Sequence, residues 1–169
     1  MYRLLFIERE DEMLKTADKR TSAALAEIVY KTAKMGGESI TDILPKIKSG
    51  NNIGECDKMR TELTRQFTEY EEIAAEAERY LSSLNCDAKE ENVMIKLSAK
   101  AGIAMNTMMD ATPSHIASMM IEGLAMGITE MTTKLREARD AGCDEKIQKL
   151  AARLVSFQES AVDEIKKFL

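Results

Sequence analysis

Apolar residues recur every three or four positions along most of the chain, the spacing of one face of an α-helix. This spacing predicts five helices, at about 2–35, 57–84, 88–109, 113–141 and 144–168, and a short helical turn at about 39–48. We expect Gly36 and Gly37 to end the first helix, because glycine readily takes the left-handed conformation of a helix end. Asp57 is the expected cap of the second helix, and Thr112 followed by Pro113 predicts the start of the fourth.

The periodicity predicts an all-α protein whose 169 residues form one domain. Strand signals are weak, because aromatic residues make up only 5% of the chain and the sequence is rich in good helix formers. Short connections favour antiparallel neighbours. We therefore expect an elongated up-down bundle of four long antiparallel helices and a fifth, shorter one at 88–109. The pattern leaves open whether 88–109 and 113–141 form one kinked helix or two helices.

The segment from Met105 to Met131 is the most unusual part of the chain. It holds seven of the twelve methionines and the only histidine, and between Ile116 and Ile128 its only polar side chains are Ser118 and Glu122. A helix that is apolar nearly all round requires cover on more than one side. We therefore expect this helix to be enclosed by protein on two opposite sides.

Two faces can be distinguished on that helix. One stripe has the four-and-three spacing of a bundle core and consists of Ala117, Ile121, Leu124, Ile128, Met131 and Leu135. The opposite face consists of His115, Met119, Glu122 and Met126. Gly123 and Gly127, four residues apart, would let a neighbouring backbone approach closely.

Three functional hypotheses follow from the second face. The leading one is a non-catalytic helical bundle that self-associates, as a homodimer, or binds a partner through a methionine-rich surface. The predicted interface residues are Met105, Met108, Met119, Gly123, Met126 and Gly127. The second is a metal or redox protein in which His115 and Glu122, two turns apart on one side, are ligands; no other cofactor is expected. The third is a sensor or carrier of small apolar ligands, because methionine side chains adapt to varied shapes.

The pattern of long helices resembles the ferritin-like superfamily. The resemblance implies a bundle of long antiparallel helices. Di-iron sites of that family use two Glu-x-x-His motifs and further carboxylates. This chain has one histidine, and Thr112 rather than glutamate stands three residues before His115. The resemblance therefore implies a member without the usual iron site, and ferroxidase activity is not expected.

Charge and cysteine content limit the other classes. The net charge of −5 argues against nucleic acid as a partner, because phosphate contacts need clustered Lys and Arg. Cys56, Cys86 and Cys143 form no CxxC pair and are expected to be free thiols in the cytoplasm. No membrane span is expected. No catalytic triad or phosphate-binding loop is present, so the sequence favours a protein that is not an enzyme. Gln158, beside the last apolar stripe, is expected to face water.

Overall fold

The fold consists of four long helices in a computed structural model that describes residues 2–47, 53–86 and 112–169, with side chains from Asp18 onward. The helices are α1 (Tyr2–Ile43), α2 (Ile53–Ser83), α4 (Pro113–Asp140) and α5 (Glu145–Ile165). Two 3-10 turns, η1 (Leu44–Lys46) and η2 (Lys166–Phe168), follow α1 and α5. The described residues contain no strand, so the all-α prediction is confirmed for them.

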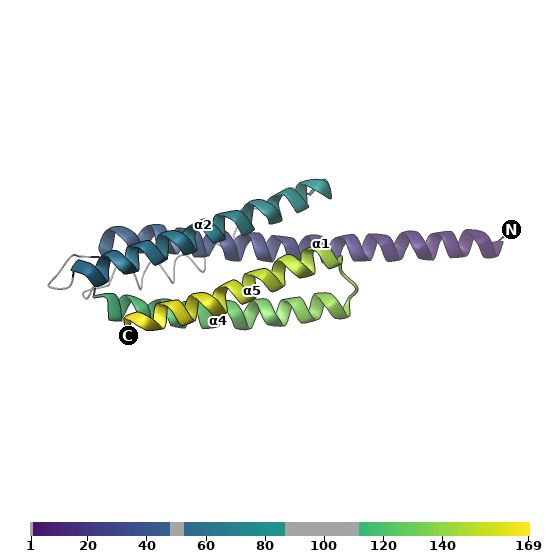
Figure 1. Cartoon of the computed structure of the whole chain (residues 1–169). Coiled ribbons are helices and arrows are strands. Elements are labelled where there is room, and N and C mark those ends of the chain that lie inside the picture. The colour runs from purple at the N-terminus through teal and green to yellow at the C-terminus, as the bar shows by residue number, and fades with distance from the viewer. Residues whose placement is uncertain (1, 48–52, 87–111) are drawn as a thin grey trace.

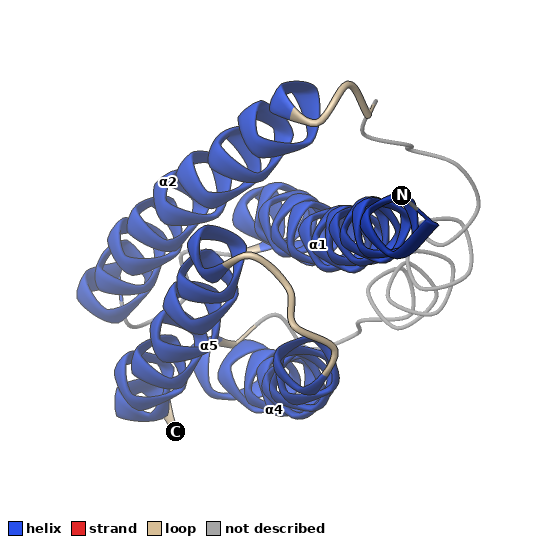
Figure 2. Ribbon diagram, turned by 90° about the vertical axis from the view of Figure 1, so that its right-hand side faces the viewer, coloured by secondary structure: helices blue, strands red, loops and turns tan. Residues whose placement is uncertain are grey.

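The helices form two antiparallel hairpins, α1 with α2 and α4 with α5 (Figure 1). The second helix of the first hairpin, α2, and the first helix of the second hairpin, α4, run in the same direction. Viewed nearly end-on, the four helices surround a common interior (Figure 2). The N-terminal part of α1 projects beyond the ends of the other three helices (Figure 1). The helix predicted at 88–109 lies outside the described residues.

The prediction that Gly36 and Gly37 end the first helix is wrong, because α1 continues through both to Ile43. The reason lies in packing against α2. A Cβ atom built on Gly36 would lie 2.6 Å from Cε1 of Tyr70, closer than carbon atoms can approach. The missing side chain at Gly36 thus makes room for the Tyr70 ring. The turn predicted at 39–48 is correspondingly the end of α1 followed by η1 at Pro45.

The other helix boundaries agree more closely with the sequence pattern. Helix α2 begins at Ile53, four residues before the expected cap at Asp57. Thr112 adopts an extended backbone and its hydroxyl accepts a hydrogen bond from the backbone N–H of His115, so α4 begins at Pro113. Asp144 caps α5 in the same way through the N–H of Lys146. Both capping side chains satisfy N–H groups that have no partner within their helices.

A single hydrophobic core is shared by all four helices. The apolar residues that recur every three or four positions in α5 and the turn after it are all buried: Ile147, Leu150, Leu154, Phe157, Ala161, Ile165 and Phe168. In α4 the predicted core stripe is buried at Ala117, Leu124, Met131 and Leu135 and half-buried at Ile121 and Ile128. The period of the apolar residues therefore located the inward faces of α4 and α5.

One layer of this core is polar and draws one residue from each helix. The Nε2 of Gln158 donates a hydrogen bond to the Tyr70 hydroxyl at 3.4 Å, and the Tyr70 ring packs edge-on against Phe157. Gly36 of α1 lies against the Tyr70 ring, and a Cβ on Gly127 of α4 would lie 2.8 Å from Gln158 Nε2. Two large polar side chains on α2 and α5 are thus matched by two glycines on α1 and α4. The expectation that Gln158 faces water is wrong, since only 3% of the residue is exposed.

A second buried glutamine, Gln66, lies one turn before Tyr70 on α2 and is fully enclosed. Its Nε2 donates to Glu62 Oε1 at 2.9 Å, but its Oε1 has no hydrogen-bond partner among the described residues. A buried amide oxygen without a partner costs about 1–3 kcal/mol. We therefore expect Gln66→Met, which is similar in shape, to raise the free energy of unfolding by about 1 kcal/mol in urea denaturation. A loss of stability would show that the amide is better satisfied than its contacts indicate.

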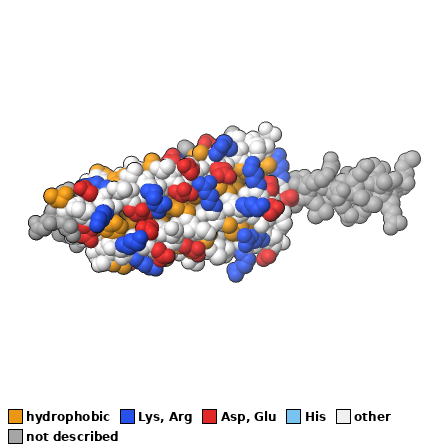
Figure 3. Space-filling model, viewed as in Figure 1, with side chains coloured by type: hydrophobic (Ala, Val, Ile, Leu, Met, Phe, Trp, Pro, Cys, Tyr) orange, Lys and Arg blue, Asp and Glu red, His pale blue; other side chains and the backbone are white. Residues whose placement is uncertain are grey.

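Polar contacts fix the turn between α4 and α5 to the first hairpin. The Tyr80 hydroxyl donates to Asp144 Oδ2 at 3.0 Å, and the backbone N–H of Asp144 donates to the Ser22 hydroxyl at 2.8 Å. Farther along α5, Arg153 forms ion pairs with three glutamates of α2: Glu69, Glu72 and Glu76. Figure 3 shows basic and acidic side chains interspersed over this side of the molecule. These contacts hold α4 and α5 in place against α1 and α2.

Candidate interaction surface on helix α4

The side of α4 that faces away from the core is open to solvent. His115, Glu122 and Met126 are exposed, and Met119 is half-buried. Met126 is 71% exposed, which is unusual for a large apolar side chain. The described residues enclose this helix on one side only, and the helix predicted at 88–109, which was one expected cover for the other side, lies outside them. They cover its core side and leave apolar atoms of its outer side without cover.

The outer side of α4 is also free of charge over two turns. Between Glu122 and Glu130 the side chains that point outward are small or apolar, and they include Ala125, Met126 and Thr129. A Cβ atom on Gly123 would meet nothing within 4 Å, so this glycine lies in open space. Gly127, by contrast, faces Gln158 inside the bundle. The two predicted interface glycines therefore have different surroundings, and only Gly123 lies on open surface.

Both threonines of this surface use their hydroxyl groups within α4 itself. Thr129 donates its hydroxyl hydrogen bond to the carbonyl oxygen of Ala125 at 2.8 Å, and Thr133 donates to that of Thr129 at 2.9 Å. Each hydroxyl is thus turned back onto its own helix. We call Ala125, Met126, Thr129 and Thr133 the outer strip of α4. The hydroxyl donors of its two threonines are thus already used within the helix, and the strip carries no charge.

A shallow groove of about 580 Å³ runs along the outer strip. Besides the strip itself, Glu130 and Lys134 line it. Lys134 forms an ion pair with Glu137 at 2.9 Å, and this hydrogen bond, together with the charges of Glu137 and Glu130, raises the pKa of Lys134. The groove therefore combines an apolar floor with a glutamate and a lysine along its edge.

The metal hypothesis places two ligands, His115 and Glu122, on this same outer side. Both are exposed, and seven residues of helix separate them by about 10 Å along the axis. The described residues contain no group of three or more His, Cys, Asp or Glu side chains that could hold a metal ion. The backbone N–H of His115 contributes to the Thr112 cap. Met105 and Met108, the other predicted interface residues, lie outside the described part of the chain.

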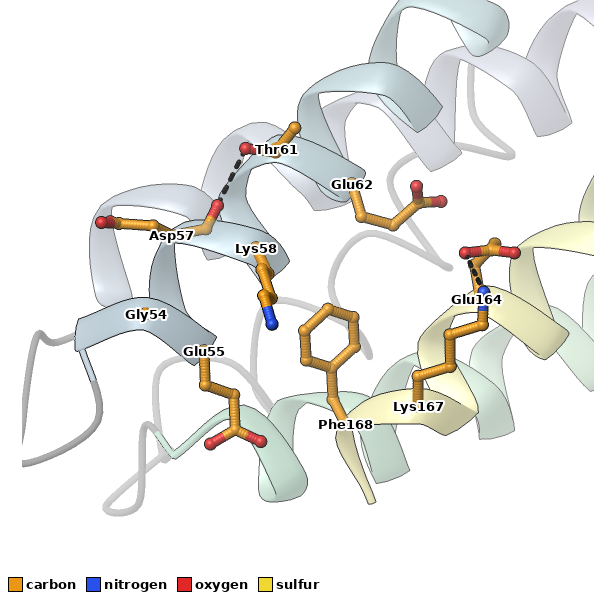
Figure 4. Close-up of a pocket in the computed structure, with 9 residues that line it drawn as sticks. All are labelled: Gly54, Glu55, Asp57, Lys58, Thr61, Glu62, Glu164, Lys167 and Phe168. Atoms are coloured by element: carbon orange, nitrogen blue, oxygen red, sulfur yellow. Dashed lines mark hydrogen bonds and ion pairs between the residues drawn. The ribbon is translucent and has the colours of Figure 1, made fainter.

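A larger cleft of about 810 Å³ lies between the start of α2 and the C-terminal turn (Figure 4). Its walls carry four acids and two lysines around Phe168: Glu55, Asp57, Lys58, Glu62, Glu164 and Lys167. Asp57 pairs with Arg60, Glu62 with Arg65, and Glu164 with Lys167. Hydrogen bonds from Arg65 and Gln66 lower the pKa of Glu62 although burial opposes the shift. Most of the charged side chains that a ligand would need therefore already form ion pairs with nearby residues.

The cysteines form no disulfide among the described residues. Cys56, Cys86 and Cys143 are free thiols, as predicted. Burial raises the pKa of the Cys143 thiol, which disfavours the reactive thiolate.

Sequence reasoning identified Met126 but missed Ala125, Thr129 and Thr133. Their signal is a repeat of small residues four positions apart, which was overlooked because threonine counts as polar. No helix within the described ranges combines the length and apolar character needed to cross a bilayer. Comparisons of the chain with protein-family models, with curated proteins and with solved structures find no match.

Proposed function

We propose that this chain is a non-catalytic helical-bundle protein that self-associates through the outer strip of α4. The single observation that carries the proposal is the exposed Met126, at 71%, in a run of outward side chains without charge. Small residues four apart allow a second helix to approach closely, and the methyl groups of Thr129 and Thr133 add apolar surface that leaves water on contact. An isologous dimer is the commonest outcome for a self-complementary patch.

The arrangement of the hairpins supports a ferritin-like assignment, which we propose alongside this function. Ferritin-like bundles contain one long crossover connection. A crossover of this kind lets α2 and α4 run in the same direction, as they do here. The free thiols support a cytoplasmic location, because disulfides are rare in that reducing compartment.

Sedimentation velocity over a range of concentrations tests the self-association. We expect the wild-type mass to rise from 18.9 kDa toward twice that value, and Met126→Lys/Thr129→Lys to remain at 18.9 kDa. Burying two unpaired ammonium groups in the contact would cost more than a weak dimer gains. Ile53→Lys is a matched control, because Ile53 is 61% exposed on another helix and its replacement should leave association unchanged. A wild-type chain that stays monomeric, or a double variant that still dimerises, contradicts the proposal.

A further inference from the structure

We propose that α4 of a second copy covers the outer strip in antiparallel orientation, with a twofold axis at Thr129 and with Glu122 of each copy opposite Arg136 of the partner subunit. The inference depends on the proposed function, to which it adds the direction and the register of the contact. It follows from the positions of the charges on the side of α4 that faces away from the core.

Glu122 and Arg136 stand on one line along that side. They are fourteen residues apart, which is two heptads. They therefore differ by about 40° around a straight helix and by still less in a supercoiled pair. Thr129 is midway between them, and all three residues are exposed. Glu130 and Lys134 lie more than about 90° from Thr129 around the helix, at the edge of a contact centred there.

Both charges are available to a second copy. Lys134 already forms an ion pair with Glu137. Among the described residues, by contrast, the side chains of Glu122 and Arg136 have no ion-pair or hydrogen-bond partner. About 21 Å of helix separates these two side chains, so they cannot pair within one chain.

The two charges select the direction of the second helix. A parallel helix in register would place Glu122 against Glu122 of the partner subunit and Arg136 against Arg136 of the partner subunit, and like charges at such distances repel. In an antiparallel pair, residues at equal distances on either side of the twofold axis face each other. An axis at Thr129 therefore joins opposite charges in both pairs, and the same patch serves both copies, as an isologous contact requires.

The two charges also select the position of the axis. Moving the axis one turn toward Ala125 would bring the two copies of Glu122 closer together. Moving it one turn toward Thr133 would bring the two copies of Arg136 closer together. With the axis at Thr129, the two attractive pairs lie about 21 Å apart, one at each end of the outer strip.

The shallow groove along the strip fits this register. An axis at Thr129 brings Met126 of the partner subunit beside Thr133, on the side of the strip where the groove lies. The exposed thioether of each copy would then be covered by the groove of the other. The residue at the axis is a small threonine, so the helix axes can approach closely. Beyond the ion pairs, Asp140 comes opposite the uncharged Ser118 of the partner subunit.

The size of the strip limits the strength of the dimer. A standard stable interface buries about 800 Å² on each partner. A contact about 21 Å long on one helix is smaller than that, so the dimer should be weak and in rapid exchange. The two ion pairs lie at the rim, where salt screens them. We therefore expect association to weaken as ionic strength rises.

Charge reversal tests the register directly. In Glu122→Arg, two arginines would face each other at both ends of the contact, and in Arg136→Glu two glutamates would do so. We expect each variant alone to dimerise at least about tenfold more weakly than the wild type in sedimentation velocity, because two attractive pairs become repulsive. A parallel contact would have like charges opposite each other in the wild type and in both variants, so it would show no such loss.

Combining the two reversals should restore association. In an equimolar mixture of the single variants, both ends of a mixed dimer would join an arginine of one chain to a glutamate of the other. The double variant Glu122→Arg/Arg136→Glu should also associate like the wild type, because both of its pairs again join opposite charges. Since the two positions are too far apart to interact within one chain, this recovery requires contact between two copies.

Two further results keep the outcomes distinct. Glu159→Arg, a charge reversal at an exposed position of α5, should leave association unchanged. Circular dichroism should show all variants equally folded, since every reversed position is exposed. If the single variants dimerise normally, or if either combination fails to recover association, the antiparallel register is wrong. Because Met126→Lys/Thr129→Lys tests the strip without reference to register, its result separates this failure from failure of the proposed function.

Discussion

Gly36→Ala should lower the free energy of unfolding by about 2 kcal/mol, even though alanine favours helix more than glycine does. The added methyl group would stand 2.6 Å from Cε1 of Tyr70. The ring cannot easily move aside, because Phe157 packs against it edge-on with ring centroids 4.8 Å apart and its hydroxyl is bonded to Gln158. Helices α1 and α2 would therefore have to separate locally. Urea denaturation followed by circular dichroism measures the loss.

Gly123→Ala is the matched control, because the same substitution there meets open space. It should raise stability by about 0.5–1 kcal/mol through helix propensity alone. Gly36→Ala should also lose much of its effect in a Tyr70→Leu background, where the obstructing ring is gone. Equal effects of the two alanine substitutions, or full additivity with Tyr70→Leu, would show that the ring does not determine the requirement for glycine.

Alkaline pH should destabilise the fold through Tyr80, by about 2–3 kcal/mol between pH 10 and pH 12. Burial, helped by the carboxylate of Asp144, raises the pKa of Tyr80 from 10.0 to about 12. Since the folded-state pKa lies above the unfolded value, the stabilisation is complete below pH 10 and is lost as the pH rises to 12. Burial raises the pKa of Tyr70 as well, so it adds to the same decline.

Tyr80→Phe separates this contribution from the others. The variant loses the hydrogen bond to Asp144 and should be about 1 kcal/mol less stable near neutral pH. Its stability should then fall less steeply above pH 10 than that of the wild type. Urea denaturation at several pH values gives the slopes, and tyrosinate absorbance reports the titration itself. Parallel slopes for the two proteins would show that Tyr80 titrates normally in the fold.

The sequence was sufficient for the helices whose ends and inward faces depend on local signals. The cap at Thr112 and the apolar stripe of α5 were predicted, because each depends on residues only a few positions apart. Gly36 was interpreted as a helix end, although tertiary packing against Tyr70 requires it inside a helix. Periodicity along one helix contains no information about the ring that another helix places against it.

The candidate surface was predicted only in part for a similar reason. Met126 was assigned correctly to the side of α4 opposite the core, but that side was expected to be covered. Apolar composition shows that a surface prefers contact, and it does not reveal whether the same chain provides the contact. The hydroxyl orientations of Thr129 and Thr133, which make the strip apolar, depend on side-chain geometry that composition cannot specify.

The central claim is that two copies of α4 meet through their outer strips, and disulfide trapping tests it most directly. Thr129→Cys places a thiol at the middle of the outer strip, where the thiols of two copies would come close enough to bond in an isologous contact centred on the strip. Replacing Cys86 by serine removes the partly exposed native thiol, and Ser156→Cys on α5 is the exposed control. Under mild oxidation we expect the variant at position 129 to form a covalent dimer of twice 18.9 kDa and the variant at position 156 to stay monomeric. Equal trapping at both positions, or none at position 129, would contradict the claim.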